Sequence, residues 1–205
     1  MRWARIVAAI AGTALVAAPV AAQTNLSIGV APYVGYMHLG DLLSGPLGTS
    51  LGGINDFVFG GRADLVITPN ISVVGNVGYV SGDMKFGIPL VGNITVGDRS
   101  ALMYDLGLRY QAPLGTGRLV PFVEAGVGAM RQKVATGPIS VTATDLAWHA
   151  GIGASVELAP EAALQLSATD YIGKFNPGDS AGLDLSTDTI HNFAVVVGIR
   201  LGLGL

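Results

Sequence analysis

Three histidines and scattered acidic side chains are the residues of this chain whose types could do acid–base or nucleophilic chemistry. Catalysis by a serine nucleophile needs a histidine within hydrogen-bond reach and a third group that orients it. His149 and Ser155 lie six positions apart in one predicted strand, which separates them by about 20 Å at the rise of a β-strand. His38 and His191 stand near acidic residues of predicted loops, but the spacing places no serine beside them. The sequence therefore predicts no catalytic residue and no enzymatic activity.

Metal, cofactor and nucleic-acid sites are not indicated either. Cysteine is absent, which removes disulfides and thiolate ligands. The histidines are scattered, and neither an HExxH zinc pattern nor a GxxxxGK[ST] phosphate loop occurs. The formal net charge of -3 comes with no basic stripe, so nucleic acid is not an expected partner. We expect no metal and no cofactor.

A second set of ionisable residues shares a pattern, because each falls on the same parity as the glycines of its segment and alternates with apolar side chains. The set comprises Arg62, Asp64, Asp105, Arg109, Glu124, Glu157 and Arg200. Period-two alternation is typical of β-strands, whose successive side chains point to opposite faces. If each parity were random, all these charges would share one parity in about one case in a hundred. The pattern predicts a sheet with ion pairs on one face and apolar side chains on the other.

The composition places this sheet in a membrane. Half of the 205 residues are apolar and 12% are charged, whereas about a quarter are charged in ordinary soluble domains. Residues 1–22 have the form of a secretory signal peptide, in which Arg2 and Arg5 precede an apolar stretch at 6–20 and small residues end at Ala22. An uncleaved anchor helix is the alternative, but this stretch is shorter than the roughly 20 residues that a span needs. We predict cleavage after Ala22 and a mature domain at 23–205.

No uninterrupted apolar run of helical length follows the signal segment. In lipid only helices and closed barrels satisfy all their backbone hydrogen bonds. The predicted fold is therefore all-β, a closed antiparallel eight-stranded up-and-down transmembrane β-barrel. Its strands are expected at 26–36, 57–67, 71–79, 102–111, 119–128, 146–158, 164–169 and 192–205.

The connections between these strands alternate in length. Those after the second, fourth and sixth strands are short, whereas long connections are predicted at 40–56, 82–99, 134–144 and 173–189. Short periplasmic turns and long external loops are typical of bacterial outer-membrane barrels. The alternating apolar residues of 86–96 leave a ten-stranded barrel as an alternative to a hairpin that continues beyond the bilayer. A soluble barrel of the lipocalin kind is disfavoured, since it would carry its apolar residues inside and more charge outside.

Three segments resemble the superfamily of OmpA-type and OmpX- or opacity-protein-like outer-membrane barrels. Residues 121–128 (PFVEAGVG), 149–160 (HAGIGASVELAP) and 191–205 (HNFAVVVGIRLGLGL) are similar to three of its strands, the last to the closing strand. As a pattern, the resemblance covers the whole mature chain. It implies a small barrel in the outer membrane of a Gram-negative cell, reached through the periplasm. Some small barrels modify lipid A, so a lipid-A-modifying enzyme is a further alternative function.

The interior of an eight-stranded barrel is just wide enough to be filled by its own side chains. Buried charges are tolerated when they are paired and hydrogen-bonded. We therefore expect a salt-bridge network that joins the three arginines of the set above to its four carboxylates. Such a network predicts a plug and not a pore. The expected function is structural, or adhesion or interaction through surface loops, with a narrow small-solute channel as the alternative.

Three charged residues, Arg131, Lys133 and Asp170, fall on the apolar parity. Each lies beside a predicted long loop, where a charge on the lipid side costs little, so we expect them at the external rim. Arg131 and Lys133 are candidates for contacts with lipopolysaccharide phosphates. The other expected partners are outer-membrane lipid, the barrel-assembly machinery during insertion, and a host or surface ligand on the loops. We expect a monomer in the cell outer membrane.

Overall fold

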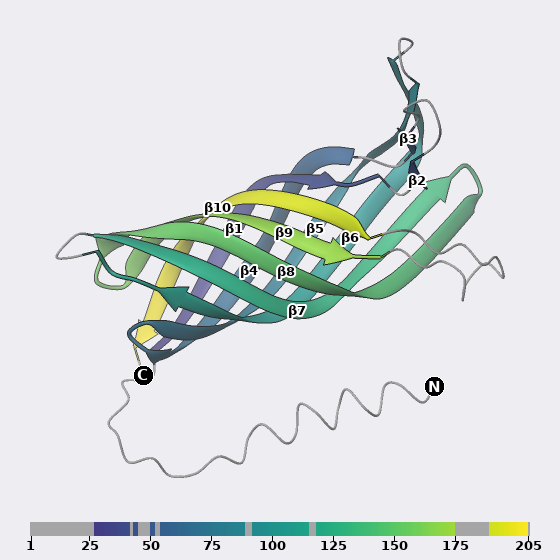
Figure 1. The fold of residues 1–205 in the computed structure, drawn as a ribbon. Coiled ribbons are helices and arrows are strands. Elements are labelled where there is room, and N and C mark those ends of the chain that lie inside the picture. The colour runs from purple at the N-terminus through teal and green to yellow at the C-terminus, as the bar shows by residue number, and fades with distance from the viewer. Residues whose placement is uncertain are drawn as a thin grey trace, which may run out of the picture.

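The computed structural model describes residues 27–41, 43–44, 50–51, 54–88, 92–114, 118–174 and 189–204. The predicted signal peptide and its cleavage position lie outside these residues. Within the part of the chain that is described, no helix is long and apolar enough to cross a membrane. The described residues form β-strands joined by turns (Figure 1).

Eight long strands close the barrel. They are β1 (Ser27–Leu39), β4 (Ile54–Thr68), β5 (Ile71–Ile88), β6 (Gly92–Gln111), β7 (Leu119–Thr136), β8 (Ile139–Ala159), β9 (Ala162–Gly173) and β10 (Ile190–Gly204). Each pairs in antiparallel fashion with the next, and β10 returns to pair with β1 from Ser27↔Gly204 to Leu39↔Asn192. The ring of pairings leaves the barrel without a free edge, as a lipid environment requires. The predicted fold class is confirmed.

Two further strands, β2 (Leu43–Ser44) and β3 (Ser50–Leu51), lie outside this ring. They pair with each other, and β3 pairs with the far end of β5 at Ser50↔Gly87 and Leu51↔Phe86. Over the barrel itself β5 is already flanked by β4 and β6, so β2 and β3 extend the sheet without widening the ring. The ten-stranded alternative is therefore wrong.

The two ends of the barrel differ in their connections. Ser27 and Gly204 are neighbours at one end, which also holds the two-residue turns Pro69–Asn70 and Pro160–Glu161 (Figure 1). Short turns and chain ends mark the periplasmic end of outer-membrane barrels. The opposite, external end carries β2, β3 and the long hairpins.

Two of the predicted external loops are largely strand. In segment 82–99, β5 and β6 remain paired as far as Ile88↔Gly92. In segment 134–144, β7 and β8 pair up to Thr136↔Ile139, and Gly137 turns the chain with a φ of 56°, a conformation that favours glycine. The predicted loop boundaries are wrong because these hairpins continue beyond the apolar band, where the alternation of hydropathy no longer marks a strand.

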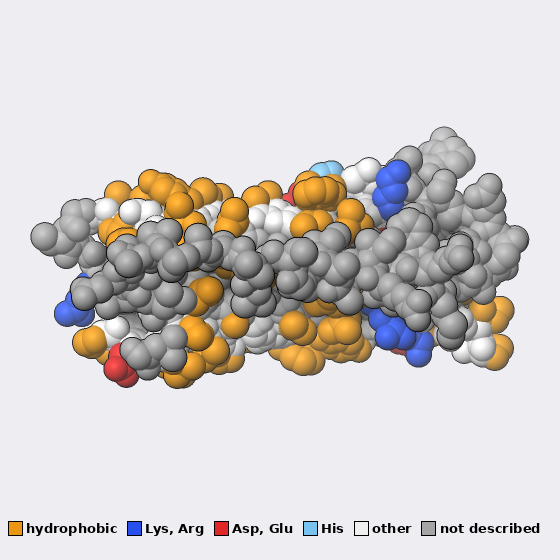
Figure 2. Space-filling view, turned by 90° about the horizontal axis from the view of Figure 1, so that it is seen from below, with side chains coloured by type: hydrophobic (Ala, Val, Ile, Leu, Met, Phe, Trp, Pro, Cys, Tyr) orange, Lys and Arg blue, Asp and Glu red, His pale blue; other side chains and the backbone are white. Residues whose placement is uncertain are grey.

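Side-chain burial alternates around the whole ring. On β7, Val123 and Val127 point outward with 53% and 38% exposure, whereas Glu124 between them is 7% exposed. Figure 2 shows the apolar band that such outward residues form on the described surface. Outward aromatic rings contact one another across strands, with Tyr36 and Phe57 at a centroid distance of 6.0 Å. The outer face is therefore suited to lipid.

We expect Leu106→Arg to destabilise the barrel by about 2–4 kcal/mol, because it places a cation on the lipid face near mid-bilayer. Leu106 is 59% exposed and lies between the outward Tyr104 and Leu108 on β6. Ile139→Arg, at an exposed hairpin tip, is the matched control and should cost about 1 kcal/mol or less. Urea titration of protein folded into lipid vesicles measures both, and equal costs would contradict the membrane placement.

Candidate functional site

The predicted ionisable residues face the lumen or its periplasmic mouth, and two of them form a bidentate ion pair. Arg200 on β10 donates from Nε to Asp64 Oδ1 over 2.9 Å and from Nη2 to Asp64 Oδ2 over 2.7 Å. A Cβ at Gly29 of β1 would lie 2.5–2.6 Å from atoms of both side chains, so the glycine leaves room for the pair. The Arg200 side chain retains 22% exposure, because the pair borders the open end of the barrel.

A second ion pair lies deeper, between cross-strand neighbours. Arg109 on β6 is the register partner of Glu124 on β7, and its Nη2 and Nε donate to Glu124 Oε2 over 2.7 and 3.0 Å. The guanidinium also lies over the Phe122 ring, 4.2 Å from its centroid. The two charged side chains are only 3% and 5% exposed. In such a setting the removal of one partner leaves an uncompensated buried charge.

His149 on β8 sits between two carboxylates. Its Nδ1 lies 3.3 Å from Asp105 Oδ1 and its Nε2 lies 3.7 Å from Glu124 Oε1. A Cβ at Gly107 or Gly126 would lie within 3.0 Å of the imidazole, so these glycines make room for the ring. The histidine joins the charges of β6 and β7 into one row. His149 shares the strand parity of Glu157, which predicts a lumen position, but its place between two acids depends on the register between strands, which the sequence alone does not determine.

Hydrogen bonds from uncharged side chains extend this row to the other side of the lumen. Asn76 on β5 donates from Nδ2 to Asp105 Oδ2 over 2.7 Å and to Tyr171 Oη over 3.2 Å. Tyr33 on β1 donates from Oη to Asn76 Oδ1 over 2.9 Å. Sequence reasoning missed these three polar residues, although each shares the parity of the lumen charges. We call the assembly the central cluster; it comprises Tyr33, Asn76, Asp105, Arg109, Glu124, His149 and Tyr171.

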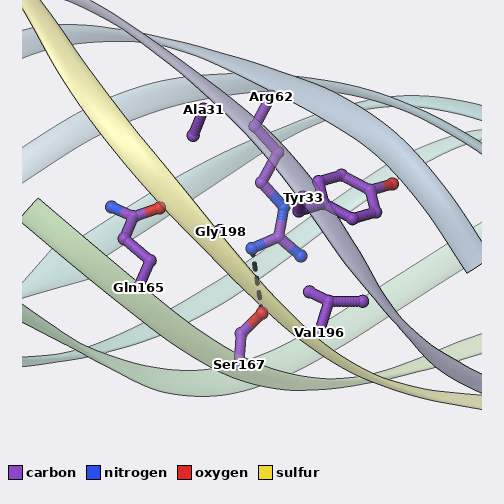
Figure 3. A pocket seen from close by; sticks show the side chains of 7 residues that line it. All are labelled: Ala31, Tyr33, Arg62, Gln165, Ser167, Val196 and Gly198. Carbon is purple, nitrogen blue, oxygen red and sulfur yellow. Dashed lines mark hydrogen bonds between the residues drawn. The ribbon is translucent and has the colours of Figure 1, made fainter.

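Arg62 on β4 lies beside the central cluster and forms no ion pair within 4.0 Å with a described residue. Its Nη1 donates to Ser167 Oγ on β9 over 2.9 Å, and its guanidinium lies 5.2 Å from the centroid of the Tyr33 ring. Figure 3 shows the guanidinium among the side chains that line a cavity of about 10 Å³. This volume is at the lower limit for one water molecule.

Glu157 lies at the periplasmic mouth and belongs to neither ion pair. It is exposed, and with Asp64, Arg109 and Arg200 it lines a cavity of about 210 Å³. No described residue forms an ion pair with it. Of the seven predicted residues, the structure therefore brings four together as two separate ion pairs, and it places Asp105 against His149.

Beyond the central cluster, a layer of apolar side chains crosses the lumen, and we call it the apolar belt. The belt comprises Met37, Leu39, Val58, Val80, Ala101, Met103, Met130, Ala147, Ala194 and Val196. These side chains come from seven of the eight barrel strands and are at most 5% exposed. The sequence predicted charges in the lumen but not this belt. Met103 and Met130, on the lumen parity of β6 and β7, were the available signal.

An arginine closes the lumen on the external side of the belt. Arg99 is fully buried, and it donates from Nη2 and Nε to Gln132 Oε1 over 2.6 and 3.2 Å and from Nη1 to the Gly40 carbonyl over 2.7 Å. The Gly40 amide in turn donates to Asn192 Oδ1 over 3.2 Å. We call these four residues the external lid. The predicted loop position of Arg99 is wrong, because β6 already begins at Gly92 and its alternation turns Arg99 inward.

The predicted rim residues face outward. Arg131 and Lys133 are exposed, whereas Gln132 between them is 2% exposed. Asp170 also faces outward, and its Oδ2 lies 2.7 Å from His191 Nδ1. All three residues lie in the external halves of β7 and β9.

The histidines find partners other than serine. His38 Nδ1 lies 2.6 Å from Asn55 Oδ1, and His191 contacts Asp170 as described above. Ser155 accepts a hydrogen bond from Gln165 Nε2 over 3.1 Å. Among the described residues, no group of three or more His, Cys, Asp or Glu side chains could hold a metal ion. The chemistry that the lumen shows is the pairing of buried charge.

We expect Arg109→Met to destabilise the barrel by about 3–5 kcal/mol, because Glu124 then stays buried without its ion-pair partner. The double variant Arg109→Met/Glu124→Leu removes both charges and should recover most of that loss. Arg200→Met is the matched control and should cost less, since its pair borders water. Urea titration in vesicles, followed by Trp148 fluorescence, measures the three variants. A double variant at least as unstable as Arg109→Met would contradict the pairing.

The chain is similar to known outer-membrane proteins in sequence pattern and in fold. The family model described as outer membrane protein beta-barrel domain matches residues 8–200, and no curated protein matches the chain.

The fold is similar to Neisserial surface protein A, with a TM-score of 0.58 and 12% identity over 85% of this chain and 96% of that one. It is also similar to two structures from Pseudomonas aeruginosa. The N-terminal β-barrel domain of OprF has a TM-score of 0.53 and 12% identity over 88% and 100% of the two chains, and OprG has 0.55 and 15% over 89% and 99%. The chain belongs to the outer membrane protein β-barrel domain family and is a protein of the outer membrane.

Proposed function

We propose that this protein is a closed barrel that acts at its external surface, in envelope structure, adhesion or another surface interaction, and not as an open pore. The observation that carries the proposal is the apolar belt, which lies between the central cluster and the external lid. An ion that entered the belt would exchange its water for apolar walls, which is very costly. The lumen therefore serves as a packed core.

Two cavities inside the described part of the barrel support the same conclusion. The one beside Arg62 has a volume of about 10 Å³. The larger one, of about 210 Å³, opens at the periplasmic mouth and is lined by no residue of the apolar belt. A solute in this mouth would still have to pass Arg62, the central cluster and the belt. The alternative function, a narrow small-solute channel, requires all three to move.

The packed external hairpins hold the loops that would carry the proposed surface function. The β5–β6 and β7–β8 hairpins continue beyond the belt, and Met84, Val96, Val134 and Ala143 on their inner sides pack together with Ile190 of β10. Loops held by a rigid scaffold are well suited to recognition. The predicted fourth loop (173–189) carries Asp179, Asp184 and Asp188, which lie outside the described residues. A ligand on that loop is part of the proposal.

Three more expectations belong to the proposal. The barrel acts as a monomer, it is inserted by the barrel-assembly machinery, and its outer rim contacts lipopolysaccharide. A lipid-A-modifying enzyme is less well supported, because within the described part of the chain His38 and His191 bond Asn55 and Asp170 and not a serine.

Planar-bilayer recordings test the closed lumen. We expect the unmodified protein to give no stable conductance steps. The variant Met37→Ser/Met103→Ser/Met130→Ser should give small steps, because short hydroxyl side chains replace three long apolar ones in the belt. Leu102→Ser/Tyr104→Ser/Leu106→Ser, on the lipid face of β6, is the matched control and should remain silent. Steps of porin size from the unmodified protein would overturn the proposal.

A further inference from the structure

A polar patch interrupts the outer face of the barrel where β6, β7 and β8 leave the apolar band. Register places Lys133 of β7 between Ser100 and Thr142, and it places Arg131 between Leu102 and Thr144. The buried side chains next to them along the strands are those of Ala101, Gln132 and Ala143, so the alternation of each strand turns the patch outward. We call it the rim patch; it comprises Ser100, Arg131, Lys133, Thr142 and Thr144.

The rim patch lies at the border between lipid and water. Two positions closer to the periplasm, the outward residues are Tyr104 on β6, Ala129 on β7 and Leu146 on β8, and these three are register neighbours. Tyr104 and Leu146 are 44% and 62% exposed, as lipid-facing side chains should be. Figure 2 shows lysine and arginine side chains near the external end of the apolar band. The patch therefore stands at the level of lipid headgroups.

The two cations of the patch have no anionic partner in the described part of the protein. Neither Arg131 nor Lys133 forms an ion pair within 4.0 Å there. They occupy alternate positions of one strand, which brings like charges to within about 7 Å of each other. An anion bound between them would relieve this repulsion, and the neighbouring hydroxyls could donate further hydrogen bonds to it.

Phosphate matches this set of donors. The planar guanidinium of Arg131 can bind two phosphate oxygens at once, and Lys133 adds a compact charge. The apolar surface directly below the patch would at the same time pack against acyl chains. A ligand that contacts both the rim patch and the apolar surface below it must be a phosphorylated lipid, since free phosphate has no apolar part.

We propose that the rim patch binds the phosphate groups of the outer-leaflet glycolipid and so fixes the barrel in that leaflet. The inference rests on the proposed function, in which the outer surface and not the lumen is the working part. It extends the contact expected at Arg131 and Lys133 to a site of five residues, with Ser100, Thr142 and Thr144 as additional ligands.

The test compares lipid retention by purified full-length protein in nanodiscs that contain bisphosphorylated lipid A, with native mass spectrometry as the readout. We expect the variant Arg131→Gln/Lys133→Gln to retain about tenfold less lipid A, because two charge-assisted hydrogen-bonding groups are lost. Lys85→Gln/Lys174→Gln removes the same charge from exposed positions outside the patch and is the matched control. It should retain lipid A like the unmodified protein. Dephosphorylated lipid A should bind all three proteins equally weakly, and millimolar inorganic phosphate should not displace the lipid.

Two outcomes would overturn the rim patch as a site. One is an equal loss of lipid A in both double variants, which would indicate a general charge effect. The other is retention that does not depend on the phosphates. Heat-modifiable gel mobility shows that each variant is folded. Conductance is recorded separately on the same preparations, so an open lumen would refute the proposed function without deciding the lipid site.

Discussion

A chain in hydrocarbon must satisfy every backbone N–H and C=O group with its own atoms. In this protein the return of β10 to β1 meets that requirement, and the rest of the structure follows from the closure. Once the ring is closed, successive side chains must point alternately to lipid and to a narrow lumen. The outward residues within the apolar band are accordingly apolar, and a charge buried on the inner face needs an ion-pair or hydrogen-bond partner within a space only a few side chains wide.

The lumen meets this second requirement by keeping its charged and its apolar side chains in separate parts along its length. Arginine–carboxylate pairs and the central cluster occupy the part nearer the periplasm, where glycines such as Gly29, Gly107 and Gly126 make room for them. The apolar belt fills the part beyond, and the buried Arg99 closes it from outside. A charged layer alone could hold water and ions. The combination of paired charges with a dry layer makes the interior a core, which moves the function to the outer surface.

The two-residue alternation of apolar and polar side chains was enough to predict the closed barrel and the face of each strand that points inward. It also predicted the lumen position of Arg109, Glu124 and Arg200. It could not predict which charges pair, because pairing depends on register between strands distant in sequence, such as Asp64 and Arg200. It misplaced Arg99, because loop boundaries were drawn where hydropathy alternation faded, although the hydrogen-bonded hairpins continue in water. The apolar belt was missed for a related reason: methionine and valine on the lumen parity do not stand out in an apolar chain.

Cysteine accessibility tests the closed lumen most directly, since the natural chain has no cysteine and a single substitution gives a unique label site. Glu157→Cys lies at the periplasmic mouth and Met130→Cys lies in the apolar belt. In protein reconstituted into vesicles and exposed to a membrane-impermeant maleimide on both sides, we expect Glu157→Cys to react fully and Met130→Cys to remain unlabelled. Labelling of Met130→Cys at the rate of Glu157→Cys would contradict a lumen closed by the belt.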